Sequence, residues 1–205
     1  MEQGVVISAY NKRGYAYAAY NFAFSIKLHN PDIKIAIIHD GIIYTELQPY
    51  QYDVFDYAIK LSEEHKQKCR AANGMIDPAM FKTGIYEHLP FEKNLFLDVD
   101  ALCLSDLQVV FDELEKDGSY YYCYTIGMHT IDKGDQVGGM GWAGADQIWA
   151  HFDLKEDSIL PASNTSFQYI KKCDESKRFY AQVLKNIKAP IDVNQLRFKW
   201  GGGQP

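Results

Sequence analysis

This chain of 205 residues lacks the signals of several common protein classes. Its four cysteines are widely spaced and form no C-x-x-C pair, which argues against a zinc ribbon or a thioredoxin-type redox motif. Lys12 and Arg13 are not followed by an apolar h-region, so the N-terminus does not resemble a signal peptide. No run reaches the roughly 18 apolar residues of a membrane span. We therefore expect no membrane span and a reducing, cytoplasmic compartment.

An excess of positive charge is also missing. Lysine and arginine number 21 against 27 aspartates and glutamates, so the formal net charge is −6. The densest basic stretch, residues 66–70, is short and interrupted, as on a solvated helix face. Because a nucleic-acid-binding protein normally carries a basic stripe, we expect no nucleic-acid partner. The composition, 47% hydrophobic and 23% charged, is typical of a globular chain, and the length suits one domain.

The N-terminal stretch predicts a βαβ unit. Residues 5–9 are apolar and β-rich, as in a buried strand. From Tyr15 the apolar residues recur at helical spacing, and Asn30-Pro31 ends that helix. Residues 34–39, KIAIIH, indicate a second buried strand. Two strands joined by a helix are normally parallel, so the pattern predicts an α/β fold with a parallel sheet.

The later pattern continues as an α/β domain. Asp77-Pro78 marks a helix start, because Asp is a good N-cap and Pro suits the first helical position. Residues 127–144 contain six glycines and are expected to form a long surface loop. Further strands are expected at 57–60, 94–99, 120–126 and 166–170, and further helices at 77–88, 107–116, 146–152 and from 174 onward.

The stretch FLDVDALCL, residues 96–104, places two carboxylates at the end of an apolar strand. An unpaired buried carboxylate costs several kcal/mol or more, so Asp98 and Asp100 need a compensating partner. Open parallel sheets bind ligands beyond the carboxyl ends of their strands. There, two carboxylates can hold one hard divalent cation, which bridges them to substrate phosphates. The motif therefore favours a Mn²⁺ or Mg²⁺ site.

Two other interpretations of this motif remain open. In a purely structural one, Asp98 ends the strand and Asp100 caps a turn or pairs with a lysine; short motifs often have no further role. In the other, an aspartate is the nucleophile of a haloacid-dehalogenase-type phosphatase. That motif normally lies on the first strand and carries Thr or Val two residues after the second Asp. Here it lies in mid-chain with Leu102 at that place, which argues against a phosphatase.

Residues 82–114, KTGIYEHLPFEKNLFLDVDALCLSDLQVVFDEL, resemble the central block of GT-A-fold glycosyltransferases, nearest to glycosyltransferase family 8 and its glycogenin-like members. In that block a helix with a lysine precedes a strand that ends in D-x-D. Residues 5–40 are similar to the family's first βαβ unit. The resemblance implies a GT-A-like, Rossmann-like α/β/α sandwich with a mostly parallel central sheet. The residues in register are Lys82, Glu92, Lys93, Asp98, Asp100, Asp106, Leu107 and Phe111.

The resemblance also implies a site for a nucleotide-diphospho-sugar. Asp98 and Asp100 would hold the metal, and these two with Lys82 would form the catalytic set. Tyr10 would stack on the base. The implied donor-site residues are Ala9, Tyr10, Asn11, Arg13, Asp40, Lys82, Asp98, Val99 and Asp100.

The acceptor side is expected in the second half of the chain. Residues 162–172, ASNTSFQYIKK, stand where the family has an Asn-Ser-Gly-like segment, which makes Asn164, Thr165 and Ser166 candidates. Trp142 lies between Gly141 and Ala143, and its ring could stack on the apolar face of a sugar.

The family also supplies a late histidine to the metal, but no histidine follows His151 here. We therefore expect residues 1–205 to form a single GT-A-like glycosyltransferase domain that lacks its C-terminal part.

The expected reaction is transfer of a hexosyl unit from a nucleotide-diphospho-sugar, with a UDP-sugar as the expected donor, to a carbohydrate or other hydroxyl acceptor. It would depend on Mn²⁺ or Mg²⁺ and, by the family resemblance, would retain the anomeric configuration. A sugar-nucleotide-binding module without turnover is the alternative. A sugar-nucleotide pyrophosphorylase is disfavoured, because SAYNKRGY after the first strand lacks the glycines of a phosphate loop.

Overall fold

The structure is a computed structural model that describes residues 2–71, 73–130, 136–137, 143–144 and 159–188. Its contacts divide the chain into two units. The first comprises residues 1–122 and 166–182, and the second comprises residues 123–165 and 183–205. Within the described residues, no helix is both long and apolar enough to cross a membrane.

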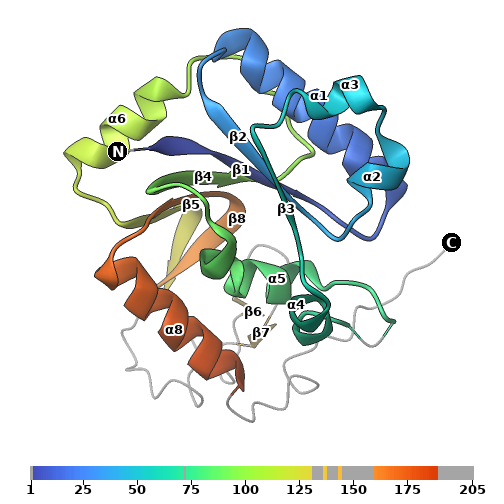
Figure 1. The fold of residues 1–205 in the computed structure, drawn as a ribbon. Coiled ribbons are helices and arrows are strands. Elements are labelled where there is room, and N and C mark those ends of the chain that lie inside the picture. The colour runs from blue at the N-terminus through green and yellow to red at the C-terminus, as the bar shows by residue number, and fades with distance from the viewer. Residues whose placement is uncertain (1, 72, 131–135, 138–142, 145–158, 189–205) are drawn as a thin grey trace, which may run out of the picture. The chain divides into compact units, whose positions relative to one another are not determined.

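Helices and strands alternate along most of the chain (Figure 1). The strands are β1 Gln3–Ala9, β2 Lys34–His39, β3 Tyr57–Lys60, β4 Lys93–Leu97, β5 Tyr121–Thr130, β6 Gln136–Val137, β7 Ala143–Gly144 and β8 Ile159–Lys171. The helices are α1 Arg13–His29, α2 Ile43–Glu46, α3 Pro49–Tyr52, α4 Glu63–Lys68, α5 Pro78–Thr83, the 3₁₀ helix η1 Ile85–His88, α6 Gln108–Lys116 and α8 Asp174–Lys188.

The main sheet has six strands in the order β3-β2-β1-β4-β8-β5. β1 pairs in parallel with both β2 and β4, and β2 pairs in parallel with β3. β8 runs antiparallel to β4, with Leu97 opposite Phe167. The mixed, mostly parallel sheet confirms the predicted fold class. In the second unit, β6 and β7 form a short antiparallel pair.

Helix α1 forms because small and apolar residues recur on one of its faces. Ala16, Ala19 and Ala23 are fully buried, which lets the helix approach the sheet closely. The backbone N–H of Asn30 donates to the carbonyl of Ile26, and the following Pro31 cannot continue the helix. This helix closes the predicted βαβ unit over β1 and β2.

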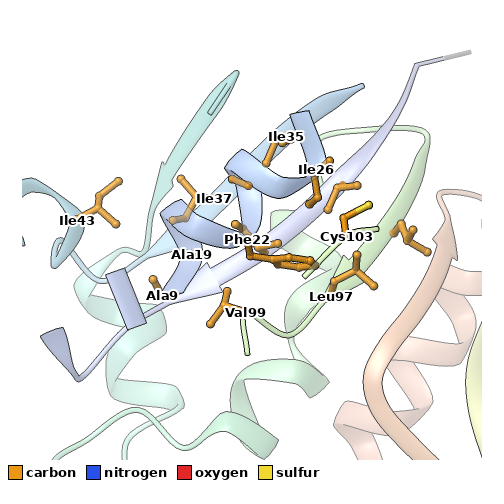
Figure 2. Packing of buried hydrophobic residues seen from close by; sticks show 14 of the residues in the cluster. Ala9, Ala19, Phe22, Ile26, Ile35, Ile37, Ile43, Leu97, Val99 and Cys103 are labelled. Atoms are coloured by element: carbon orange, nitrogen blue, oxygen red, sulfur yellow. The ribbon is translucent and has the colours of Figure 1, made fainter. Parts of the chain in front are cut away.

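Alternate residues of the strands supply two cores, one on each face of the sheet. Val5, Ile7 and Ala9 of β1 pack with α1, as do Ile35 and Ile37 of β2; Figure 2 shows several of these side chains around Phe22. Residues of α2 and α6 belong to this same cluster. Val6, Ala36, Ile38 and Phe96 face the other way, where they meet residues of α5, η1 and α8.

The strands predicted at 34–39 and 57–60 have the bounds of β2 and β3. The strands predicted at 5–9, 94–99 and 166–170 overlap β1, β4 and β8, with different bounds. The helix expected at 77–88 is interrupted at Gly84, where α5 ends and η1 begins. A Cβ at this glycine would lie 3.3 Å from the His65 ring. The lack of a side chain at Gly84 therefore leaves room for the His65 ring of α4.

The expectation of one loop at 127–144 is wrong in part, because β5 extends to Thr130 and β6 and β7 lie within the range. The helix expected at 146–152 lies outside the described residues.

Candidate functional site

The strand order reverses at β1: β2 and β3 lie on one side of it, and β4 lies on the other. Connections then leave the carboxyl ends of β1 and β4 in opposite directions and open a crevice between them. A cavity of about 400 Å³ lies at this place. Its walls come from the end of β1 and the turn after it, from residues 71, 73 and 75–78, and from Lys82 and Asp98 to Asp100.

Asp98 lies half-buried in the cavity wall and is held by Lys82 of α5. The Lys82 ammonium lies 2.7 Å from Oδ1 and 2.9 Å from Oδ2 of Asp98. The same ammonium lies 5.7 Å from the centroid of the Phe96 ring. The Asp98 backbone N–H donates to the carbonyl of Ser166 on β8 at 2.9 Å. The Lys82 ammonium thus offsets the desolvation cost of placing the Asp98 carboxylate at a strand end.

Asp100 is exposed and lines the same cavity. Between the two carboxylates, Val99 is 7% exposed and belongs to the core beneath α1. The D-x-D spacing therefore directs two carboxylates to the cavity while the residue between them anchors the backbone.

These two carboxylates fit a divalent cation that is shared with a phosphate ligand. Mg²⁺ in such sites is usually held by one or two carboxylates together with substrate phosphates and water. Within the described part of the chain, no group of three or more His, Cys, Asp or Glu side chains is placed to hold a metal ion. The donor set of Asp98 and Asp100 thus suits a bridging ion rather than a cage made only of protein groups.

Tyr10 lies in the cavity wall at the end of β1, with its ring mostly buried. It is 7% exposed, and its ring centroid lies 5.0 Å from that of Phe81. Burial raises the pKa of the Tyr10 hydroxyl well above its usual value. The hydroxyl is therefore protonated at neutral pH, and only a small part of the ring faces the cavity.

Three residues expected in the donor site do not line this cavity. Ala9 is 1% exposed and packs in the core under α1. The Arg13 guanidinium is 2.7 Å from the Glu46 carboxylate, and its side chain is 74% exposed. Asp40 accepts hydrogen bonds from the backbone N–H groups of Asn11 and Ile42. The cavity brings together the other six: Tyr10, Asn11, Lys82, Asp98, Val99 and Asp100.

The sequence interpretation missed one cavity wall, which we call the 70–77 hairpin (residues 70–77, with residue 72 outside the described residues). Arg70 and Ile76 form an antiparallel bridge, and Gly74 has a φ of +83° at the turn. The dipeptide Asn73-Gly74 is a recognised hairpin-turn signal and could have revealed the hairpin. Lys12 was also missed, although it lines the cavity beside Asn11.

A chain of buried and half-buried polar side chains lies at the base of this hairpin. The Cys69 sulfur is 3.4 Å from His65 Nε2, and His65 Nδ1 is 3.0 Å from His88 Nε2. Burial raises the pKa of the Cys69 thiol and lowers the pKa of both histidines. The thiol is therefore protonated, and both rings are neutral at neutral pH.

The acceptor-side candidates are only partly described. Trp142 lies outside the described residues. Asn164 and Thr165 lie on β8 in the second unit. Ser166 belongs to the first unit, where its backbone carbonyl accepts from Asp98.

No protein-family model matches this chain, and no curated protein matches it. Solved structures do resemble it. The bifunctional glycosyltransferase WbbM is 13% identical with a TM-score of 0.59, over 92% of this chain and 35% of WbbM. Mouse xyloside xylosyltransferase 1 is 9% identical with a TM-score of 0.55, over 97% and 77%.

The galactosyltransferase LgtC, in complex with donor and acceptor sugar analogues, is 15% identical with a TM-score of 0.54. The match covers 90% of this chain and 70% of LgtC. At such low identity these likenesses establish the architecture, and the chain has the GT-A-like α/β fold.

Proposed function

We propose that this chain is a glycosyltransferase that moves a hexosyl unit from a nucleotide-diphospho-sugar to a hydroxyl group of a carbohydrate or other acceptor. We propose a UDP-sugar as donor and Mn²⁺ or Mg²⁺ as cofactor. The observation that carries this proposal is the cavity at the carboxyl ends of β1 and β4, with Asp98, Asp100 and Lys82 in its wall. A phosphate-bearing ligand at a strand-order reversal is what this sheet type accommodates.

Each of these residues has a role in the proposed site. Asp98 and Asp100 would hold the cation, which when bound stabilises the charge on the leaving diphosphate. Lys82 orients the Asp98 carboxylate through two short contacts and brings a positive charge to the cavity wall. Lys12, on the turn after β1, adds a second cationic side chain to the same cavity.

Likeness to glycosyltransferases of known structure supports the reaction class. LgtC was solved with donor and acceptor sugar analogues, and it shares this architecture over 90% of the chain. We further propose that the chain is related to glycosyltransferase family 8 and that it retains the anomeric configuration. Asn164, Thr165, Ser166 and Trp142 are proposed to serve the acceptor side.

The test measures the binding of a panel of nucleoside diphosphates, with and without Mn²⁺, by calorimetry and by thermal unfolding. We expect UDP to bind only with the metal, and Asp100→Asn to weaken binding by about tenfold or more through loss of one charged ligand. Asp112→Asn is the matched control, because Asp112 is an exposed carboxylate on α6 that does not line the cavity. It should leave binding unchanged.

Turnover separates the proposal from its alternative. Release of UDP from UDP-hexoses in the presence of sugar acceptors would support a transferase. Metal-dependent binding without any turnover across a broad set of donors and acceptors would favour the binding module. Failure of every nucleotide to bind would overturn both.

A further inference from the structure

The backbone conformation of Asn11 is unusual and is fixed by a neighbouring strand. Among the described residues it is the non-glycine residue with a positive φ, +68°. Asparagine tolerates this left-handed region better than most residues. The Asn11 N–H donates to Oδ2 of Asp40 at 2.9 Å, while Oδ1 of Asp40 accepts from Ile42 at 3.0 Å. The end of β2 thus holds the end of β1 in this conformation.

The Asn11 side chain is paired with a single distant peptide. Its Nδ2 donates to the carbonyl of Ile76 at 2.8 Å, and its Oδ1 accepts from the N–H of Ile76 at 2.8 Å. One amide side chain therefore satisfies both polar groups of that residue, as a neighbouring strand would. Ile76 is 6% exposed, so loss of these bonds would leave buried backbone groups without partners.

Ile76 belongs to the 70–77 hairpin, which forms one wall of the cavity. Within the hairpin, the backbone N–H of Ala71 donates to the carbonyl of Met75, and that of Asp77 donates to the carbonyl of Cys69. The Asn11 amide connects the hairpin to the end of β1, which also lines the cavity. This pair of hydrogen bonds, together with the Ile76 side chain that packs in the same core cluster as Tyr10, therefore joins two parts of the cavity wall.

We propose that Asn11 is a positioning residue that fixes the width of the donor cavity by clamping the 70–77 hairpin to the end of β1. Asp40 supports the clamp by holding the Asn11 backbone. This inference rests on the proposed function for its ligand, a nucleoside diphosphate, but the clamp itself is a property of the ligand-free chain. Asn11 thus acts on the donor through Ile76 and the hairpin.

The first experiment measures amide hydrogen exchange at Ile76 in the full chain without ligand. Asn11→Gly keeps the left-handed backbone but removes both side-chain hydrogen bonds. We expect exchange at Ile76 to accelerate by about tenfold or more, since each such bond contributes about 1 kcal/mol. Asn21→Ala, at an exposed position on α1, is the matched control and should leave that amide unchanged. Unchanged exchange at Ile76 in Asn11→Gly would overturn the clamp.

The second experiment uses UDP with Mn²⁺ and the variant Asn11→Asp. The ionised carboxylate of this variant can accept from the Ile76 N–H, but it cannot donate to the Ile76 carbonyl oxygen and is repelled by it. At pH 8 the introduced aspartate is ionised, so we expect this variant to raise the dissociation constant about tenfold or more over the wild type. Asn11→Gly, which loses both hydrogen bonds without adding a charge, should raise it about tenfold.

The two readouts separate the clamp from the proposed function. Faster exchange at Ile76 with no UDP binding by the wild-type chain would retain the clamp and overturn the nucleotide assignment. Weaker UDP binding with unchanged exchange would show that Asn11 contacts the ligand directly, which would overturn the positioning role. An Asn11→Asp variant that binds UDP as tightly as the wild type would also count against it.

Discussion

Gly4 shows at the scale of one residue how tightly β1 is packed. A Cβ at this position would lie 2.5 Å from the Phe91 ring and 2.7 Å from the carbonyl oxygen of Lys34. We expect Gly4→Ala to lower the free energy of unfolding by about 1–3 kcal/mol, because Phe91 and the neighbouring strand must move. Urea denaturation followed by circular dichroism measures this difference.

Gly14 provides the control for that substitution. Nothing lies within 4 Å of a Cβ added there, and the residue is in the first turn of α1. Gly14→Ala should leave stability unchanged or raise it by up to about 1 kcal/mol. Equal effects of the two substitutions would show that the crowding at Gly4 relaxes without cost.

Single residues of the site were predictable to different degrees. Asp98 and Asp100 could be proposed because two carboxylates at a strand end are a recognisable pattern, and Lys82 could be proposed because the family resemblance implied it. Arg13 could not be excluded, because the sequence does not say that its side chain turns to Glu46. Position after a strand places a residue at an edge of the sheet but does not fix the direction of its side chain.

At the scale of elements, Glu115 ties α6 to the sheet. Its carboxylate lies 2.9 Å from the Lys93 ammonium on β4 and accepts from the Tyr169 hydroxyl on β8 at 2.9 Å. The hydrogen bond from Lys93, followed by that from Tyr169, lowers the pKa of Glu115 to about 2. An unfolded glutamate has a pKa near 4.3. The contribution to stability is therefore complete above about pH 4.5 and is lost as the pH falls toward 2.

We expect Glu115→Gln to lower the free energy of unfolding at pH 7 by about 1 kcal/mol, a modest value because the carboxylate is partly exposed. The difference from the wild type should shrink as the pH is lowered from 4.5 to 2.5. Chemical denaturation across this range measures it, with Glu113→Gln on the exposed side of α6 as control. A difference that is independent of pH would contradict the ion-pair explanation.

Whole elements were predicted best where their signals are local. β2 has the predicted bounds and α1 has the predicted end at Asn30-Pro31, because a buried run and a helix stop are local signals. β3 also has the predicted bounds, although it is short and mostly exposed. The four-residue helices α2 and α3 were not predicted, since one turn has no period to detect. The antiparallel pairing of β8 with β4 joins residues that are far apart in sequence, so no local sequence pattern predicts it.

For the whole molecule, buried histidines predict a loss of stability in acid. His39 is fully buried and lies edge-on to Tyr44, and burial lowers its pKa to about 4. Burial also lowers the pKa of His65 and of His88. An unfolded histidine binds its proton near pH 6.5, so the unfolded chain takes up protons first. The free energy of unfolding should therefore fall as the pH decreases from about 6.5 to about 4.

His39→Asn tests the largest of these contributions. His39 Nδ1 accepts from the N–H of Gly41 at 3.0 Å, and an asparagine oxygen can accept in the same turn. The variant should lose less stability than the wild type between pH 7 and pH 4.5, by about 1–3 kcal/mol. Parallel curves for the two proteins in urea titrations at these pH values would show that His39 does not titrate on unfolding.

Cys69 has a practical consequence for experiments on the cavity. Its side chain is 4% exposed, and its carbonyl accepts the bond that closes the base of the 70–77 hairpin. A thiol reagent can reach this sulfur only when the base opens, so its alkylation rate measures that opening equilibrium. The chain thus carries an intrinsic reporter of local unfolding beside the proposed donor site, and its alkylation must be read separately from that of the less buried Cys123 and Cys173.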